Sequence, residues 1–544
     1  MQKFLFIILI FLLHLTPALA KTLSKSELFY QNAGNRDFVK SGTPLLLQLL
    51  NGAGVKSAAF RAAYNESSRP STDVFADSNK GHFRAHYDTT GVDAPNMTDS
   101  DWNGVPDFVD STLVYLEYAY SIVIKLAYGA PKSDNGLGGS NAVDVYIEDL
   151  APQKYYGVTY PDESSSMGSS YSSYLVLDNN YTDKIFPTQG YPALRVTSAH
   201  EFFHVIHYSY YGGDDSIWWM EESAVWMEDY AWDDVNDYIK NYADSYLLNR
   251  DVSLDTTDQS MYGASLFAFF LAKKYGPDTI RSVWSSFKDH QSGRIDLLNM
   301  VIPDPDGLPS VIADLGVWLY FTGVRANPVD FLKDSALFNR TVTPSATFLS
   351  VPAVDSLTFQ HCTFKYVDIS PPNGFALNDS LSFEFYERDG GLWKKEVILY
   401  NSPTDYVVKK LTGSPGLVVI PKFFQKAVLV IASGSTEYQQ HYLVYSVKRG
   451  FIPTEVPVSM YLNQNYPNPF NKETLITYYV PKESHIKLRV VNLAGQTVSV
   501  LADRVDQKGQ YTVPFNASGL PSGQYLIVLE SGSTMVTGKM LFLK

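Results

Sequence analysis

The sequence predicts a multidomain chain, in which an α/β (α+β) domain is followed by a β-sandwich domain and a second, small β-sandwich domain. The first observation is the length of 544 residues, 45% of them hydrophobic, which is enough apolar material for several cores. The second is a mixture of helix-like and strand-like segments over residues 81–344. The third is a change after residue 345 to short alternating runs separated by Gly, Pro, Asn and Asp, which is typical of antiparallel sandwiches.

Residues 1–20 have the pattern of a secretory signal peptide. Lys3 gives a positive start, residues 4–13 are apolar, and Ala18-Leu19-Ala20 is a small-residue cleavage site. A retained membrane anchor is the alternative, but the apolar run is short for crossing a bilayer. No other long uncharged apolar segment occurs, so we expect no transmembrane helix after signal removal. Residues 21–80 are mixed in composition and are expected to form a propeptide or an N-terminal extension.

The strands and helices expected in the α/β region and in the two sandwiches can be placed by residue range. Apolar periodicity predicts strands at 83–87, 143–147 and 174–177, and helices at 112–126, 194–208, 216–229 and 262–275. The first sandwich is expected over 345–450, with strands at 381–386, 396–400, 417–420 and 427–432. Residues 451–460 are expected to be a linker, and residues 461–544 form the second sandwich.

Charge and cysteine content exclude some classes of protein. The formal net charge is -14 and no basic stripe occurs, so we expect no nucleic-acid partner. Cys362 is the single cysteine, which rules out a disulfide within the chain. It lies in a segment, 359–364, that we expect to be a strand, and a buried thiol is expected there.

The segment 196–208 contains a His-Glu-x-x-His motif. On a helix, His200 and His204 lie one turn apart on one face, so both imidazoles can bind a single ion. Glu201 is rotated away from that line and is expected to act as a general base on zinc-bound water, whose pKa the metal lowers. Because the motif is short, two histidines packed in a core are the alternative interpretation.

A catalytic zinc site needs a third protein ligand. The next predicted helix offers Glu221 and the adjacent Glu222, and helical phase leaves either as the ligand. Glu228 lies two turns beyond Glu221 and is expected either to orient a histidine or to be a solvated acid. His207 lies one turn beyond the motif and is expected to be an orienting or core residue.

The two helices resemble those of the gluzincin metallopeptidases, in which a glutamate on the second helix completes the zinc site. That helix often reads Glu-x-x-Ala-x-x-x-Glu, matched here by Glu221, Ala224 and Glu228. The resemblance implies a zincin-like metallopeptidase domain over 81–344, with Glu221 as the third ligand. The spacing between the helices is shorter than in the aminopeptidases of that group, and Glu222 stands where glycine is common, so Glu222 remains an alternative.

Two further segments resemble metallopeptidases. Residues 260–271 are similar to the segment that supplies a tyrosine in gluzincin aminopeptidases, which implies that Tyr262 stabilises the oxyanion; a packing role is the alternative. Residues 81–290 resemble a family of bacterial secreted metalloproteases, through His-Tyr-Asp-x-x-Gly at 86–91, a calcium-like loop, and His-Glu-Phe-Phe-His followed by Trp-Met-Glu. This resemblance supports the class of activity and implies no particular substrate.

Residues 99–110 have the spacing of a calcium-binding loop. Side-chain oxygens stand at positions 1, 3, 5, 9 and 12 of a twelve-residue loop, and Gly104 at position 6 permits a sharp turn. The expected ligands are Asp99, Asp101, Asn103, the carbonyl of Val105, Asp107 and Asp110. Position 12 is Asp rather than Glu, and an acidic turn that caps the next helix is the alternative.

Residues 461–544 carry the most specific resemblance. Tyr-Leu-Asn-Gln-Asn-Tyr-Pro-Asn-Pro-Phe-Asn at 461–471 resembles the opening of the type A C-terminal sorting domains of the type IX secretion system, and segments 491–498, 519–525 and 539–544 fit the same domain. The resemblance implies recognition by the type IX secretion machinery and export across the inner and outer membranes, to the cell surface or the medium. An accessory β-domain that binds carbohydrate is the alternative.

Together these patterns predict a secreted zinc metallopeptidase that hydrolyses peptide bonds in a protein or peptide substrate by attack of zinc-bound water. The expected cofactors are zinc and calcium. The alternative is a catalytically degenerate binding or adhesion protein of the cell surface that retains the fold. An aminopeptidase ranks lower, because no Gly-x-Met-x-Asn-like segment lies near the motif.

Overall fold

In the computed structural model, the chain forms two compact units, residues 1–449 and 450–544. The structure describes residues 23–33, 37–52, 55–163, 170–248, 251–387, 391–413, 415–451 and 459–544. The expected signal peptide, 1–20, lies outside the described residues, as does most of the expected linker, 451–460.

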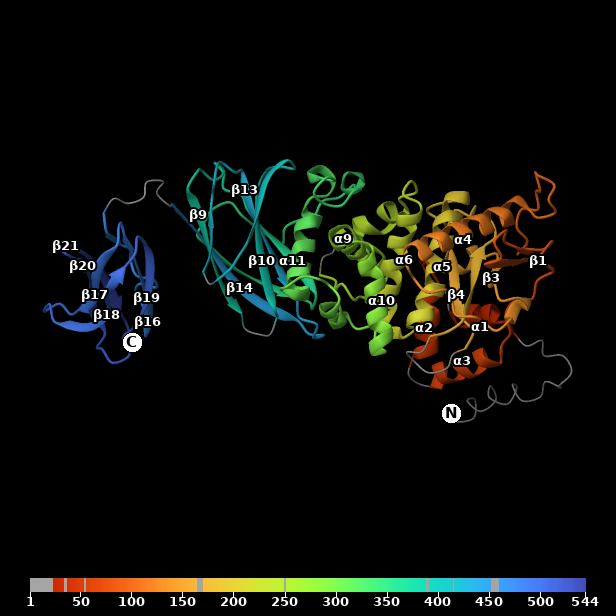
Figure 1. Ribbon diagram of the computed structural model, residues 1–544, viewed down its shortest axis with the longest axis horizontal. Helices are drawn as coiled ribbons and strands as arrows, with labels where there is room; N and C mark the ends of the chain where they lie inside the picture. Colours follow the sequence, from red (N-terminus) through yellow and green to blue (C-terminus); the bar gives the residue numbers. More distant parts are fainter. Residues whose placement is uncertain are drawn as a thin grey trace, which may run out of the picture. The chain divides into compact units, whose positions relative to one another are not determined.

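A five-stranded sheet organises the first half of the larger unit (Figure 1). Its strands are β1 (Val74–Asp77), β2 (Phe83–Tyr87), β3 (Val143–Glu148), β4 (Gly157–Pro161) and β5 (Ser173–Asp178). They follow the order β1-β2-β3-β5-β4, with β2, β3 and β5 parallel and the two outer strands antiparallel to their neighbours. Strand β4 is therefore an edge strand, and an isolated parallel bridge joins its first residue, Gly157, to Ser41.

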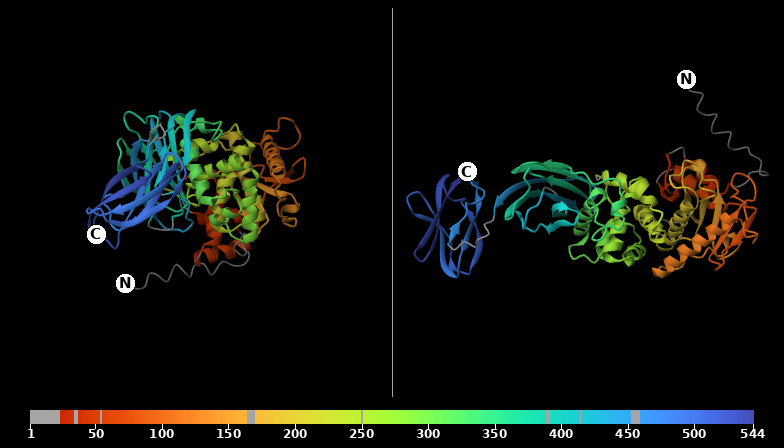
Figure 2. Two further views of the ribbon diagram at one scale, coloured as in Figure 1. Left: turned by 60° about the vertical axis from the view of Figure 1, so that its left-hand side comes forward. Right: turned by 90° about the horizontal axis from the view of Figure 1, so that it is seen from above.

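Helices cover both faces of this sheet (Figure 2). Alternate residues of each strand point to opposite faces. Val145 and Leu175 join a core with helices α4 and α5, whereas Tyr146 and Val176 join a separate core with the N-terminal helices. The N-terminal helices are α1 (Lys25–Ala33), α2 (Thr43–Asn51) and α3 (Val55–Glu66). Helix α4 spans Asp107–Lys125, and helix α5 spans Gly190–Tyr210. The described part of residues 21–80 is thus folded against the sheet.

Further helices complete the α/β region. They are α6 (Ile217–Ala231), α7 (Asp244–Leu248), α8 (Met261–Ala264), α9 (Leu266–Tyr275), α10 (Asp278–His290) and α11 (Gly307–Tyr320). The predicted strands and helices of this region are confirmed, with two differences. Helix α4 begins at Asp107, before the predicted start, and the predicted helix 262–275 is interrupted at Ser265, whose hydroxyl donates to the carbonyl of Tyr262. Within the described residues, no helix is both long and apolar enough to span a membrane.

Two sheets form a sandwich after residue 345, with orders β11-β10-β13-β8-β6 and β12-β9-β14-β7. The strands are β6 (Ala346–Phe348), β7 (Ala353–Phe359), β8 (Thr363–Ile369), β9 (Asp379–Glu387), β10 (Trp393–Ser402), β11 (Asp405–Lys410), β12 (Gly416–Val419), β13 (Lys426–Ser433) and β14 (His441–Phe451). One core lies between the sheets, and helix α11 packs on the outer face of the first. Gly316 permits this close approach, because a Cβ there would lie 2.7 Å from Val430.

The smaller unit is an antiparallel β-structure of two sheets, β15-β16-β19 and β18-β17-β20-β21, around its own core. Its strands are β15 (Tyr461–Leu462), β16 (Glu473–Val480), β17 (Ser484–Val491), β18 (Thr497–Asp506), β19 (Gly509–Asn516), β20 (Gly523–Ser531) and β21 (Thr534–Phe542).

Candidate metal centre

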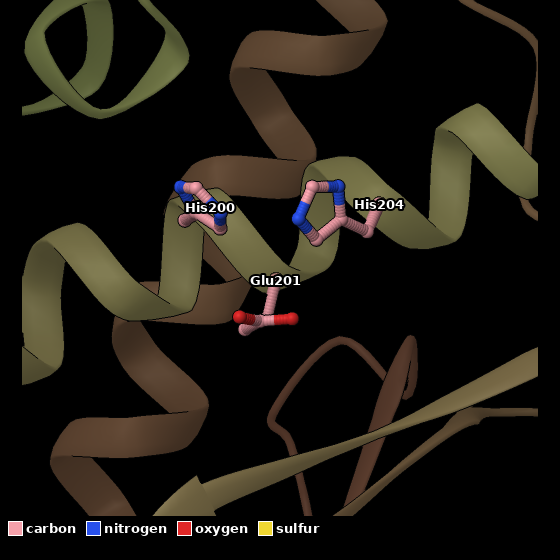
Figure 3. Close-up of side chains that lie close together, drawn as sticks. All are labelled: His200, Glu201 and His204. Carbon is pink, nitrogen blue, oxygen red and sulfur yellow. The ribbon is translucent and has the colours of Figure 1, made fainter. Parts of the chain in front are cut away.

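The His-Glu-x-x-His motif lies in the middle of helix α5. Figure 3 shows the imidazoles of His200 and His204 side by side on the helix, with Glu201 rotated away from them. One potential ligand atom from each of the three residues lies within 4.8 Å of the others. The helix is surrounded by protein, and its apolar neighbours Phe202 and Phe203 are fully buried. The sequence therefore places a polar triad inside an apolar core, where a polar group is costly unless it has a partner.

Glu221 on helix α6 meets both histidines. Its Oε1 lies 3.0 Å from Nε2 of His204, and its Oε2 lies 3.3 Å from Nε2 of His200. All four atoms are buried, and none of them has the alignment of a hydrogen bond to a partner in the described part of the chain. The two imidazole nitrogens and the carboxylate oxygens thus face one shared space, in which the carboxylate contacts both rings. Two imidazole nitrogens and one carboxylate are a donor set that suits Zn²⁺ with a position left open, so these residues fit the metal.

Glu222 is not part of this cluster. Neither of its carboxylate oxygens has a hydrogen-bond partner within the described part of the chain, although the residue is fully buried. Burial, and then the negative charge of Asp255, raise the pKa of Glu222 well above its usual value. A carboxyl group in this environment favours the neutral form, which is a poor metal ligand.

The charges within the cluster favour an ionised Glu221. Burial raises the pKa of Glu221, but the positive charge of His204 and the contact with His200 outweigh it and lower that pKa to about 2. Burial lowers the pKa of His200, but contacts with Glu221 and Glu228 raise it to about 10. The carboxylate is therefore held in the form that binds a cation, and a metal would compete with the proton for the imidazole.

Two residues around the cluster fix the histidine rings. Nδ1 of His200 lies 2.6 Å from Oε1 of Glu228, which leaves Nε2 directed at Glu221. Nδ1 of His207 lies 3.2 Å from Nδ1 of His204, while its ring stacks on Trp284 at 4.2 Å between ring centroids. Glu228 is 2% exposed, so the interpretation as a solvated acid is wrong and the orienting contact is present.

Glu201 faces strand β4. Its Oε2 accepts hydrogen bonds from Oγ1 of Thr159 at 2.8 Å and from Oγ1 of Thr43 at 3.2 Å, whereas Oε1 has no hydrogen-bond partner. A Cβ at Gly157 would lie 2.7 Å from Cγ of Glu201, so only glycine lets β4 pass this close. Sequence reasoning did not find Thr43 or Thr159, because neither lies in a motif or near position 201 in the chain.

Tyr262 on helix α8 belongs to the same buried region. Its hydroxyl oxygen accepts a hydrogen bond of 3.3 Å from the backbone N–H of Ser41. Burial, and then the negative charge of Glu221, raise the pKa of Tyr262 well above its usual value. The phenol therefore stays protonated and can donate a hydrogen bond. Tyr262, the three potential ligands and Glu201 are each at most 1% exposed.

The predicted calcium loop is compact and exposed. The backbone N–H groups of Asn103 and Gly104 donate to Asp99, at 3.2 and 2.9 Å. The side-chain amide of Asn103 donates to Asp101 at 3.2 Å and to Asp110 at 2.9 Å. Gly104 has a φ of +90°, a conformation that glycine adopts without strain. The predicted ligands at positions 1, 3, 5 and 12 are thus brought together.

The remaining members of the loop are also close. Asp107 accepts hydrogen bonds from the N–H and the hydroxyl of Ser100, at 2.8 and 2.6 Å. One carboxylate oxygen each from Asp99, Asp101 and Asp107 lies within 4.8 Å of the others. Val105 donates its N–H to Oδ1 of Asn103 at 2.7 Å.

A third acidic cluster contains Asp229, Asp233 and Asp334. Nζ of Lys333 lies 2.7 Å from Asp229 and 3.6 Å from Asp334, and it also pairs with Asp233. An ammonium group already neutralises this cluster, which makes it a poor candidate for a metal.

Comparison with known proteins identifies one part of the chain. Residues 464–543 match the family described as secretion system C-terminal sorting domain, within the smaller unit. The expectation of a type IX sorting domain is confirmed. Domains of this family mark proteins that the type IX secretion system exports to the cell surface or outside the cell, so this chain is recognised by that machinery and exported.

Solved structures give only distant likenesses. A β-1,2-glucanase from Parabacteroides distasonis matches at 12% identity and a TM-score of 0.16, over 35% of this chain and 32% of that one. The adhesin domain of Epf from Streptococcus pyogenes matches at 9% identity and a TM-score of 0.14, over 35% of this chain and 76% of that one. β-Glucuronidase 3 from Bacteroides uniformis matches at 16% identity and a TM-score of 0.15, over 34% and 27%. No curated protein matches the chain. At these scores the likenesses carry no functional argument.

Proposed function

We propose that this exported protein is a zinc-dependent metallopeptidase, with His200, His204 and Glu221 as the metal ligands. One observation carries the proposal: three buried side chains direct two imidazole nitrogens and two carboxylate oxygens at one another over 3.0–3.3 Å, and within the described residues none of these atoms has a hydrogen bond of good alignment. An unsatisfied buried polar group costs about 1–3 kcal/mol, so a cluster of them favours a bound cation. The resemblance to the gluzincins supports a zincin-like fold for the surrounding domain.

The side chains around the ligands have separate roles in peptide hydrolysis. Zinc supplies a Lewis acid that polarises a carbonyl group and lowers the pKa of water. Glu201 takes a proton from the attacking water on its free Oε1, while Thr159 and Thr43 hold its Oε2. It then delivers that proton to the leaving amine. Tyr262 donates a hydrogen bond to the oxyanion that forms on the substrate.

Two residues act through the ligands rather than on the substrate. Glu228 fixes the ring of His200 by accepting from Nδ1, which keeps Nε2 available to the metal. His207 supports the ring of His204 through the contact between their Nδ1 atoms. Burial, and then the charges of His204 and His200, lower the pKa of His207 well below its usual value. A neutral His207 adds no positive charge beside the cation.

We also propose that the loop of residues 99–110 binds calcium for structural reasons. Carboxylates of Asp99, Asp101 and Asp107 already lie within 4.8 Å of one another, and Asn103 links them to Asp110. Oxygen ligands of this number and spacing suit Ca²⁺. The ion would brace the start of helix α4, which begins at Asp107 and packs on α5.

The test pairs metal content with activity. Bound zinc per chain and casein hydrolysis are measured for the wild type and for Glu201→Gln. We expect about one zinc in both proteins and hydrolysis by the wild type alone, because the substitution removes the base and not a ligand. Absence of zinc from both, without cleavage by either, would instead support a cell-surface binding protein that retains the fold. Release of single residues from peptide N-termini in place of internal cleavage would indicate an aminopeptidase.

A further inference from the structure

A segment near the start of the chain runs along the open edge of the central sheet. Residues 39–43, which we call the strap, lead into helix α2 and include its first residue, Thr43; they lie beside residues 154–157, where β4 begins. The N–H of Val39 donates to the carbonyl of Lys154 at 2.9 Å, and the N–H of Tyr156 donates to the carbonyl of Lys40 at 3.1 Å. The N–H of Gly42 donates to the carbonyl of Gly157 at 2.9 Å. Two of these partners, Lys154 and Tyr156, lead into β4, and Gly157 is its first residue, so the strap pairs with the beginning of this edge as an added strand would.

The strap passes directly over the candidate catalytic groups. Ser41 contacts the hydroxyl of Tyr262, and Thr43 donates to Oε2 of Glu201. Both strap residues are at most 2% exposed. The strap thus contacts both the proposed base and the phenol, so a substrate that reached these groups would meet the strap.

The ammonium group of Lys40 in the strap is buried between two carboxylates, and we call the space that it occupies the acidic pocket. Its Nζ lies 2.9 Å from Oε2 of Glu228 and pairs with Asp237, and all three side chains are at most 3% exposed. The rings of Tyr156 and Tyr242 lie 5.5 Å from the ammonium group, within range of cation–π attraction. Glu228 also contacts the histidine ligand His200, so the pocket adjoins the metal centre.

We propose that the edge of β4 is the binding track for an extended polypeptide substrate, that the pocket between Glu228 and Asp237 receives a Lys or Arg side chain of that substrate, and that the strap occupies both in cis. The proposal rests on the proposed peptidase function and gives it a substrate class and a form of regulation. An extended peptide binds a sheet edge through main-chain hydrogen bonds, and side-chain pockets supply the specificity.

Electrostatics favours a basic side chain in the pocket. Removing the cation from a buried ion pair leaves uncompensated negative charge, which is strongly unfavourable in a buried site. Once the strap leaves, Glu228 and Asp237 therefore need another cation. A tethered segment also competes at an effective concentration of about millimolar. A free peptide at micromolar concentration cannot displace the strap readily, so the protein with the strap in place is largely latent.

The test uses the full chain with a weakened strap. Lys40→Met keeps the length of the side chain and removes its charge. Lys25→Met is the matched control, because Lys25 is also buried in the N-terminal segment but donates to the carbonyls of Tyr64 and Ser67, away from the site. Cleavage of a peptide mixture is followed by mass spectrometry, and zinc per chain is measured in every protein.

We expect Lys40→Met to cleave about tenfold faster than the wild type, with Lys or Arg at one fixed position relative to the cleaved bond, as for release of a tethered competitor. Lys25→Met should cleave at the wild-type rate. Adding Asp237→Asn to Lys40→Met should remove the basic preference while cleavage continues. A second strap variant, Gly42→Ala, should also accelerate cleavage, because its Cβ would lie 2.5 Å from Cγ2 of Val158 and force the strap from the edge.

Other outcomes overturn the proposal. Unchanged cleavage by zinc-loaded Lys40→Met and Gly42→Ala would mean that the strap is a fixed wall of the site. Faster cleavage without a basic preference would reject the pocket as a subsite. If Lys40→Met does not fold, Gly42→Ala alone decides between these results. A failure of the proposed function is distinct, since zinc would then be absent from the wild type as well as from the variants.

Discussion

The two candidate ion sites differ in what surrounds their ligands. At the helix pair α5–α6, the histidine and glutamate ligands are at most 1% exposed, and their facing atoms contact one another but have no aligned hydrogen bond among the described residues. In the loop of residues 99–110, the carboxylates are reached by solvent and accept hydrogen bonds from the loop itself. The buried site therefore has unmet bonding capacity, whereas the loop is largely satisfied without an ion.

This difference predicts different couplings between metal and fold. Buried polar groups without partners cost free energy that a cation can recover, so zinc should contribute directly to the stability of the larger unit. The loop can keep its shape through its own N–H donors, and calcium should add a modest increment. Removal of the two metals should thus affect the protein to very different extents.

The largest effect is expected from Glu201→Gln. Loss of a general base should reduce cleavage by at least about 10³-fold, while the zinc content stays near that of the wild type. The rate is best measured in the Lys40→Met background, where the strap no longer limits access. Glu222→Gln is the control, because that buried acid contacts neither histidine. Activity of Glu201→Gln close to that of its parent would remove Glu201 from the mechanism.

Tyr262→Phe should have the next largest effect. Removing one donor to the oxyanion should lower kcat by about 10²-fold, with little change in KM. Tyr160→Phe serves as the control, since the hydroxyl of Tyr160 is buried like that of Tyr262 but lies in the separate core formed with the N-terminal helices, where no described residue hydrogen-bonds to it. Equal rates for the two variants would assign Tyr262 to packing.

Glu228→Gln should weaken the metal site without abolishing it. The loss of an orienting carboxylate typically lowers metal affinity by about 10- to 100-fold, which a competing chelator can measure. Glu117→Gln is a matched control, because Glu117 is buried and accepts from His82 at 2.8 Å in a comparable contact outside the site. An unchanged affinity in Glu228→Gln would show that Glu228 serves the pocket of Lys40 alone.

The smallest effect is expected in the loop. Asp101→Asn should reduce the increase in Tm caused by added calcium by about 2–4 °C, which corresponds to about 1 kcal/mol for a domain of this size. Zinc content and cleavage should not change. Asp289→Asn, an exposed acid on α10, is the control. If calcium does not change the Tm of the wild type, the loop is better interpreted as an acidic turn that caps α4.

Local patterns made much of the fold and site predictable. His200 and His204 lie one turn apart on one helix, and Glu221 follows on the next helix, so short-range geometry brings them together. The sequence did not decide whether Glu221 or Glu222 is the third metal ligand, because either side chain can face a neighbouring helix. Packing between α5 and α6 decides this, and only Glu221 contacts the two imidazoles.

Contacts between distant segments were not predictable. Thr43 meets Glu201 across 158 positions, and Lys40 meets Asp237 across 197. No periodicity in the sequence reports such pairs. The expectation that Cys362 lies in a strand was also wrong. It occupies the turn between β7 and β8, with a φ of +47°, where its thiol donates to the carbonyl of Ser435 at 3.2 Å. Its burial agrees with the expectation.

The most direct measurement is the zinc content of the purified full-length chain, compared between the wild type, Glu221→Gln and Glu222→Gln. The proposed site predicts about one zinc per chain in the wild type and in Glu222→Gln, and a strong loss in Glu221→Gln, larger than the 10- to 100-fold effect of an outer partner. A wild type without zinc, or a Glu221→Gln protein that binds it as tightly as the wild type, would contradict the proposed metal centre.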